Sequence, residues 1–126
     1  MAQASANLNV MIKTARRAAR GLLRDFGEVE NLQVSAKGPG DFVSRADMRA
    51  EQTIRADLTE ARPNYGWLAE ESEPVAGPDP TRRWIVDPLD GTTNFLHGIP
   101  HWAISIALEH KGEIVAAVIY DPAKDE

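Results

Sequence analysis

The sequence predicts an α+β domain in which two N-terminal helices pack on a largely antiparallel sheet. Apolar residues recur at helical spacing in the first half of the 126-residue chain, and they alternate at the two-residue period of strands near its end. Because the helices precede the strands instead of alternating with them, the layers are expected to be segregated, as in α+β proteins. The length suffices for one domain with a modest core.

The first helix is expected to run from about Leu8 to Phe26, because apolar side chains return every three or four residues across this range. Ser5 or Asn7 can cap its start, and Gly27 can end it. Its arginines fall mainly on the opposite face, where solvation is their ordinary role.

The second helix is expected to begin at Ser44, because Ser44 and Asp47 match the S-x-x-[DE] capping box that opens helices. The Gly-Pro-Gly run at 38–40 predicts a loop before it. An apolar stripe continues from Ala50 to Ala61, and a proline follows, which predicts the end of the helix there.

Four strands are predicted, at 65–69, 84–86, 102–109 and 113–120, with 31–36 as a further candidate. A Lys-Gly turn between the last two strands predicts a hairpin. The proline-rich segment before the strand at 84–86 is expected to be a surface loop. That strand is expected to run into a turn that carries two carboxylates.

Acidic residues follow two of the predicted strands: Glu70 and Glu71 follow the first, and Asp87 and Asp90 follow the second. If these strands are neighbours in one sheet, the carboxylates crowd one edge, and their mutual repulsion favours a bound divalent cation. Mg²⁺ takes oxygen ligands, usually with one or two carboxylates. The alternative is that the glutamates are ordinary loop acids and the aspartates shape a turn.

Hydroxyl residues come next in the chain. Thr92 and Thr93 follow Gly91, where the start of a helix would point free backbone N–H groups at an anion. Asp47 is a further candidate, as a carboxylate that accepts a proton from a threonine hydroxyl so that the threonine orients an attacking water. Helix capping is the alternative role of these three side chains. Lys37 could reach a phosphate, although solvation is the more ordinary role of a lysine.

Composition limits the function classes. The net charge of −5 makes the whole chain a poor candidate for binding nucleic acid, although the first 24 residues contain five basic residues and no acid. His97 and His101 do not predict a zinc site, because the chain has no cysteine and the neighbouring ligands are all oxygens. With no apolar run of membrane-spanning length and no secretory signal, a cytoplasmic protein is expected.

Four segments resemble the inositol monophosphatase family in their order along the chain. The segment WIVDPLDGTTNF at 84–95 resembles the first signature of this family, and it is the most specific match. The other three are DFVSRADMRAEQTI at 41–54, GWLAEES at 66–72 and VIYDPAKDE at 118–126. The resemblance implies a layered sugar-phosphatase fold and a Mg²⁺-dependent, lithium-sensitive hydrolase acting on inositol 1-phosphate or a related sugar phosphate.

The resemblance also implies a metal-ligand set. Glu70, Asp87 and the main-chain carbonyl of Leu89 would hold one Mg²⁺, and Asp87 and Asp90 would hold a second. Glu71 would support these ligands from outside the metal site.

The catalytic and substrate-binding roles are implied in the same way. Asp90, together with the backbone N–H groups of Gly91 and Thr92 and the Thr92 hydroxyl, would bind the substrate. Thr92 paired with Asp47, together with Glu70, would orient and activate a metal-bound water. Lys37 matches a family lysine near the metals.

The family's second signature, W-D-x-A-A-G, does not occur in the sequence. Residues 1–126 are therefore expected to be the N-terminal portion of a domain about twice as long, and the segment alone is expected to be inactive. A homodimer is the default expectation from the family. Other substrates within the superfamily remain open, namely fructose 1,6-bisphosphate, histidinol phosphate and 3′-phosphoadenosine phosphate. So does a regulatory role of the extragenic suppressor type, in which the protein binds the transcription machinery or RNA.

Overall fold

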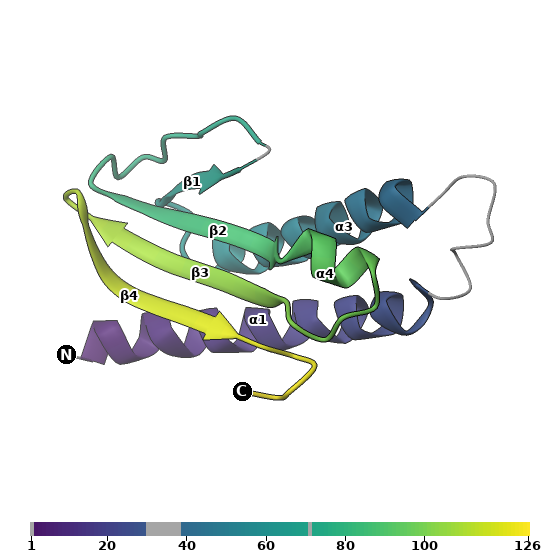
Figure 1. Ribbon diagram of the computed structural model, residues 1–126. Helices are drawn as coiled ribbons and strands as arrows, with labels where there is room; N and C mark the ends of the chain where they lie inside the picture. Colours follow the sequence, from purple (N-terminus) through teal and green to yellow (C-terminus); the bar gives the residue numbers. More distant parts are fainter. Residues whose placement is uncertain (1, 30–38, 71) are drawn as a thin grey trace.

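Two helices cover one face of a four-stranded sheet in the computed structural model, which describes residues 2–29, 39–70 and 72–126 (Figure 1). The helices are α1 (Ala2–Gly27), α3 (Pro39–Ala61) and the short α4 (Thr92–Leu96). The strands, in their order across the sheet, are β1 (Gly66–Ala69), β2 (Arg82–Asp90), β3 (Ala103–His110) and β4 (Glu113–Tyr120). The predicted α+β class, with two N-terminal helices on a sheet, is confirmed.

The sheet is antiparallel except at one edge. The pairs β2·β3 and β3·β4 are antiparallel, as the predicted hairpin requires, whereas β1 and β2 are parallel, with Ala69 opposite Val86. Residues 70–81 connect these two parallel strands, and this connection brings the C-terminal ends of both to the same edge.

Strand β2 is longer than the sequence predicts. It already includes Arg82 and Arg83, which were expected in a loop, and it continues to Asp90 through the predicted acidic turn. Asp87 pairs with Ser105 and Asp90 with Ala103, so the register shifts by one residue between them. The two aspartates therefore flank a β-bulge at the end of a strand, a position that tolerates the intervening proline.

Helix α3 begins at Pro39, five residues before Ser44, so the capping-box prediction is wrong. Proline is favoured in the first turn of a helix, where its missing N–H costs nothing. Val43 and Ala46 are buried at 6% and 1% exposure, and they extend the apolar stripe of the helix toward its start. Ser44 and Asp47 consequently lie within the helix, where their side chains are not needed for capping.

Helix α1 likewise begins earlier than expected, at Ala2, and it ends at Gly27 as predicted. Asn7 is therefore not a cap: it is buried, and its Oδ1 accepts a hydrogen bond of 2.7 Å from Nε of Arg62. The candidate strand at 31–36 lies outside the described residues. No helix in the described part of the chain is long and apolar enough to cross a membrane.

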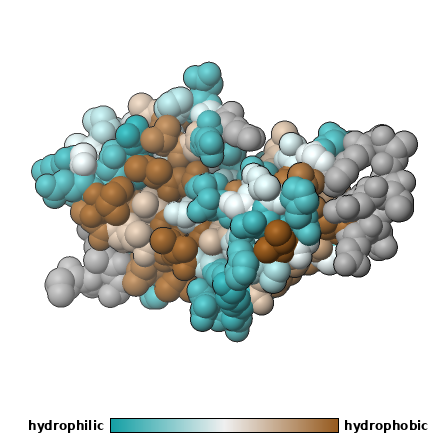
Figure 2. Space-filling model, viewed as in Figure 1, coloured by the Kyte–Doolittle hydropathy of each residue, from teal (hydrophilic) through white to brown (hydrophobic). Residues whose placement is uncertain are grey.

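The core lies between the helix layer and the sheet. Its largest fully buried apolar side chains come from both layers: Met11, Leu22, Ile54, Leu58, Trp84, Phe95, Ile104 and Ile106. The opposite face of the sheet has no such cover in the described part of the chain, and Val115 and Ile119 of β4 are 52% and 72% exposed. Figure 2 shows hydrophobic side chains gathered over the strands on this side.

Candidate metal and phosphate site

Glu70 and Asp87 come together because β1 and β2 are parallel neighbours. Ala69 is opposite Val86, so the next residue of each strand, Glu70 and Asp87, reaches the same edge of the sheet. Both line a cavity of about 130 Å³, and α3 closes its other side with Asp47 and Glu51. Four carboxylates, two from α3, one from β2 and one just after the end of β1, thus border one small space.

Glu51 is a residue that the sequence reasoning missed. It follows Asp47 by four positions on α3, and side chains at this spacing lie on the same helix face. Once Asp47 was a candidate, this spacing was the available signal. Its carboxylate adds to the negative charge of the cavity.

A second cavity, of about 230 Å³, adjoins the first at Asp47. It is lined by Ser44 and Asp47 of α3 and by Thr92 and Thr93 of α4. Asp47 therefore borders both the cavity that Glu70 and Asp87 line and the cavity that Thr92 and Thr93 line. Because α3 begins at Pro39, Ser44 and Asp47 are three residues apart on one helix face and can serve the same cavity.

The start of α4 is fixed by backbone geometry. Gly91 precedes the helix with a φ of +96°, and its carbonyl accepts a hydrogen bond of 3.0 Å from the N–H of Phe95. Asn94 Nδ2 donates to the carbonyl oxygen of His101 at 2.8 Å, and Phe95 is fully buried. No side chain caps this helix at Gly91, so neither Thr92 nor Thr93 is its N-cap.

The remaining predicted site residues lie near these cavities or outside the described chain. Leu89 and Asp90 belong to the bulged end of β2, where the Leu89 side chain is buried and Asp90 is exposed, and neither lines the two cavities. Lys37 and Glu71 fall outside the described residues. His97 is exposed, and its Nδ1 lies 2.8 Å from the carbonyl oxygen of Thr93.

The donor set fits Mg²⁺ in its chemistry. Carboxylates line the first cavity without any histidine, and hard cations prefer oxygen donors, often with retained waters. A volume of about 130 Å³ leaves room for an ion with several waters, since a cavity holds one water from roughly 10–15 Å³ upward. Within the described residues, however, no three histidine or acidic side chains stand close enough to form a ready-made metal site.

Comparison with known proteins gives three informative relatives. Inositol-1-monophosphatase of Rhizobium meliloti (strain 1021) is 64% identical over 122 residues, which are 97% of this chain and 46% of that protein. The crystal structure of extragenic suppressor protein suhB from Bartonella henselae matches with a TM-score of 0.85 at 54% identity, over 96% of this chain and 46% of that chain. Nus factor SuhB of Vibrio cholerae serotype O1 is 40% identical over 119 residues, covering 94% of this chain and 45% of that protein.

The chain thus spans about half the length of the curated relatives that it matches. The model of the inositol monophosphatase family matches residues 4–126, which include both cavities and all four sequence segments described above. The chain belongs to the inositol monophosphatase family.

Proposed function

We propose that the full-length protein hydrolyses phosphate monoesters with the help of Mg²⁺, and that inositol 1-phosphate or a related sugar phosphate is its substrate. The observation that carries this proposal is the position of Asp47, which borders both the cavity lined by Glu70 and Asp87 and the cavity lined by Thr92 and Thr93. Hydrolysis of a phosphate ester needs cations that neutralise the charge of the phosphate, beside hydroxyl or amide groups that bind its oxygens. The cavity lined by carboxylates suits the cations, and the cavity at Thr92 and Thr93 adjoins it and suits the phosphate.

The residues of this chain have distinct roles in the proposed reaction. The backbone N–H groups of Gly91 and Thr92 bind the phosphate, with Asp90 contacting the substrate. Asp47 accepts a hydrogen bond from the Thr92 hydroxyl, so the hydroxyl oxygen accepts a hydrogen bond from the attacking water. Glu70 orients the same water, which attacks phosphorus opposite the leaving oxygen. Lys37 and Glu71 would act at the edge of the same site, on the strength of the family resemblance alone.

Members of the family are generally metal-dependent, and the donor set described above suits Mg²⁺. Glu70, Asp87 and the carbonyl oxygen of Leu89 would hold one ion, and Asp87 with Asp90 a second. When bound, the ions supply positive charge that offsets the developing charge on the phosphoryl oxygens and the leaving alkoxide.

The proposal is tested by phosphate release from inositol 1-phosphate by the full-length protein, with and without Mg²⁺. Thr92→Val and Asp47→Asn are each expected to lower kcat by roughly 100-fold or more, the usual scale for losing a positioned proton acceptor or its partner. Thr93→Val is the matched control, because Thr93 lines the same cavity and has no assigned role. Equal losses in both threonine variants, or release that is independent of Mg²⁺, would contradict the assignment. The same assay with the three alternative phosphate esters decides the substrate.

Residues 1–126 alone are proposed to be inactive, because the sequence lacks the family's second signature and the metal-ligand aspartate within it. The same assay on the 126-residue chain is expected to give no release above background. Turnover comparable to that of a full-length relative would show that this half contains all the groups the chemistry needs.

A second candidate function is regulatory binding to the transcription machinery. Lys13, Arg17, Arg20 and Arg24 are all exposed and recur along one face of α1, and one relative bears the name Nus factor. If this face binds RNA polymerase or RNA, replacing Arg16, Arg17 and Arg20 with glutamine should abolish that binding and leave phosphatase activity intact. Unchanged binding in this triple variant would remove the candidate.

A further inference from the structure

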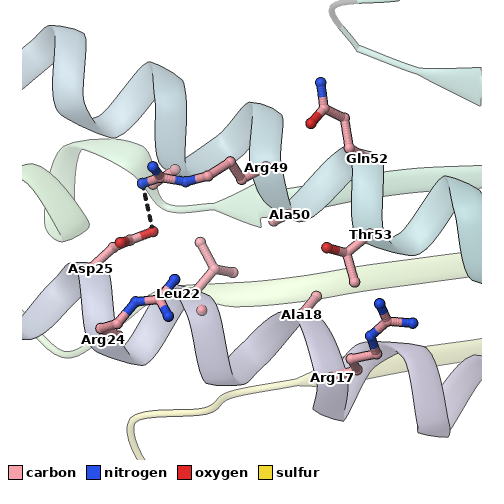
Figure 3. Close-up of a pocket in the computed structure, with 11 residues that line it drawn as sticks. Arg17, Ala18, Leu22, Arg24, Asp25, Arg49, Ala50, Gln52 and Thr53 are labelled. Atoms are coloured by element: carbon pink, nitrogen blue, oxygen red, sulfur yellow. Dashed lines mark hydrogen bonds and ion pairs between the residues drawn. The ribbon is translucent and has the colours of Figure 1, made fainter.

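A third cavity, of about 250 Å³, lies between α1 and α3 (Figure 3). Four small residues line it, Ala18 and Gly21 from α1 and Ala46 and Ala50 from α3, together with the buried side chains of Leu22 and Asp25. The three alanines are buried, and none of the four residues extends beyond Cβ, so the groove between the helices stays hollow. This cavity shares no lining residue with the two cavities of the candidate active site.

Three guanidinium groups surround this hollow. Arg17 and Arg24 come from α1, and Arg49 comes from α3, together with the Thr53 hydroxyl and the Gln52 amide. In Figure 3 the arginines of α1 lie toward opposite ends of the hollow, and Arg49 stands across from Arg24. Hydrogen-bond donors from two helices therefore face one small space.

The Arg24 guanidinium lies beside Gly21, which also lines the cavity. Its Nη2 atom is 3.8 Å from the point where a Cβ of residue 21 would lie, which is an ordinary van der Waals distance. Arg24 has neither an ion pair nor a hydrogen bond to a side chain within residues 2–29, 39–70 and 72–126.

The other two arginines are each balanced by one acid. Arg17 pairs with Asp57 at 2.5 Å, and Arg49 pairs with Asp25 at 3.1 Å. Both arginine side chains remain more than half exposed, at 59% and 52%. Because a guanidinium has five N–H donors, each retains donors for a ligand. Among the described residues, no acid forms an ion pair with Arg24.

We propose that this cavity binds a phosphate group, either as free phosphate or as a small phosphate monoester. Guanidinium groups match phosphate oxygens in paired hydrogen bonds. The donors come from two helices and so approach a ligand from different directions. A tetrahedral phosphate offers oxygen acceptors in several directions, whereas a carboxylate offers two oxygens in one plane. The volume of about 250 Å³ lies below the usual range for larger organic ligands, which selects a small anion.

The proposal is tested by titrating inorganic phosphate into the ¹⁵N-labelled 126-residue chain and recording amide NMR spectra. Ionic strength is held constant with chloride, and divalent cations are removed. The amide signals of Gly21, Ala50 and Thr53 are expected to shift together and to saturate as one site. Movement of the Gly91 and Thr92 signals alone, or shifts that grow linearly without saturation, would overturn the proposal.

Three variants separate a defined site from diffuse attraction. Arg24→Gln is expected to weaken phosphate binding at these amides by about tenfold or more, since a charge-assisted hydrogen bond is lost. Arg20→Gln removes the same charge from an exposed position that does not line the cavity, and it should change binding by less than about twofold. Gly21→Leu fills the hollow without changing charge and raises helix propensity, and it should abolish the saturating shifts.

Equal weakening in Arg20→Gln and Arg24→Gln would show that only the charge of the helix face matters, and would overturn the site. Unchanged binding in Gly21→Leu would also overturn it, provided that the spectrum of this variant remains dispersed. Glycerol 3-phosphate, titrated in parallel, identifies the source of the phosphate group. Tighter binding than inorganic phosphate assigns the site to a monoester, and equal or weaker binding assigns it to free phosphate.

Discussion

Gly91 connects the bulged end of β2 to α4 in a backbone conformation that other residues rarely adopt, with a φ of +96°. A Cβ at this position would lie 2.9 Å from the carbonyl oxygen of His101 and 3.2 Å from Cα of Trp102. Both neighbours are backbone atoms, which cannot rotate away as a side chain would. The placement of Thr92 beside the second cavity therefore depends on a glycine at position 91.

Gly91→Ala is expected to lower the free energy of unfolding by at least about 2 kcal/mol, because left-handed strain and a backbone clash add. Gly98→Ala is the matched control: its φ is +71°, and a Cβ there would have no neighbour within 4 Å. This control should cost only about 1–2 kcal/mol of strain. Urea unfolding of both variants checks the difference, and equal losses would show that the loop at His101 yields to the new Cβ.

At the scale of elements, polar side chains buried on α1 join it to the second helix and to the residue just after it. Thr14 Oγ1 donates to Asp57 at 2.8 Å, and Arg49 donates to Asp25 at 3.1 Å. Arg62, just after α3, donates to Asn7 near the other end of the contact between α1 and α3, which is called the seam below. Because a buried polar group without a partner is costly, these bonds fix how far one helix is displaced along the other.

Thr14→Val is expected to destabilise the chain by about 1–2 kcal/mol, because it removes a hydrogen bond from a buried hydroxyl to a charged acceptor. Arg17→Gln removes the other partner of the same Asp57, but the Arg17 side chain is 59% exposed. Its loss should cost less than about 1 kcal/mol. Thermal or urea unfolding ranks the two variants, and a larger effect of Arg17→Gln would show that the ion pair governs the seam.

The sequence predicted the helices and the hairpin, because their signals are local. It misplaced the start of α3, because Ser44 and Asp47 satisfy a local capping pattern while the buried side chain of Val43 extends the helix upstream. An apolar residue seven positions before Ala50 was the signal for this extension. Between Asp87 and Asp90 the sequence predicts a turn, because an Asp-Pro pair commonly starts one, whereas the structure has a β-bulge there.

The candidate site was predictable in its residues but not in its assembly. The sequence does not predict that β1 pairs with β2, because contacts between distant segments leave no periodic pattern. The clustering of the carboxylates could therefore be stated only on the assumption that these strands are neighbours. Parallel pairing then brought Glu70 beside Asp87. The i+4 spacing from Asp47 indicates that Glu51 shares its helix face, but only the packing of α3 against the strand ends brings Glu51 to the cavity.

At the scale of the whole molecule, apolar side chains of the strands are exposed on the face of the sheet that α1 and α3 do not cover, called the outer face here. Ile119 is 72% exposed on β4, an edge strand whose sequence from Ile114 to Tyr120 contains no charge and no proline. Natural edge strands commonly carry charged side chains or proline, which prevent the strand from pairing with a strand of another molecule. The isolated 126-residue chain is therefore expected to self-associate as its concentration rises.

Ile119→Lys is expected to reduce this self-association, because it places a charge on the exposed face of the edge strand. Ile99→Lys makes the same chemical change at a residue that is 42% exposed and lies outside the sheet, and it should have little effect. Sedimentation velocity over a wide range of concentration measures both variants. Equal reduction in both would attribute the effect to net charge instead of the strand.

The contact between α1 and β4 forms late during translation, because β4 is synthesised well after α1. These two elements pack together although one is made first and the other ends at Tyr120. At about 5–20 residues per second, on the order of ten seconds separate their emergence from the ribosome. Until β4 is synthesised, the apolar face of α1 can pack only against elements that precede β4 in the chain. A chaperone that binds the nascent chain can therefore bind this apolar face before the complete sheet covers it.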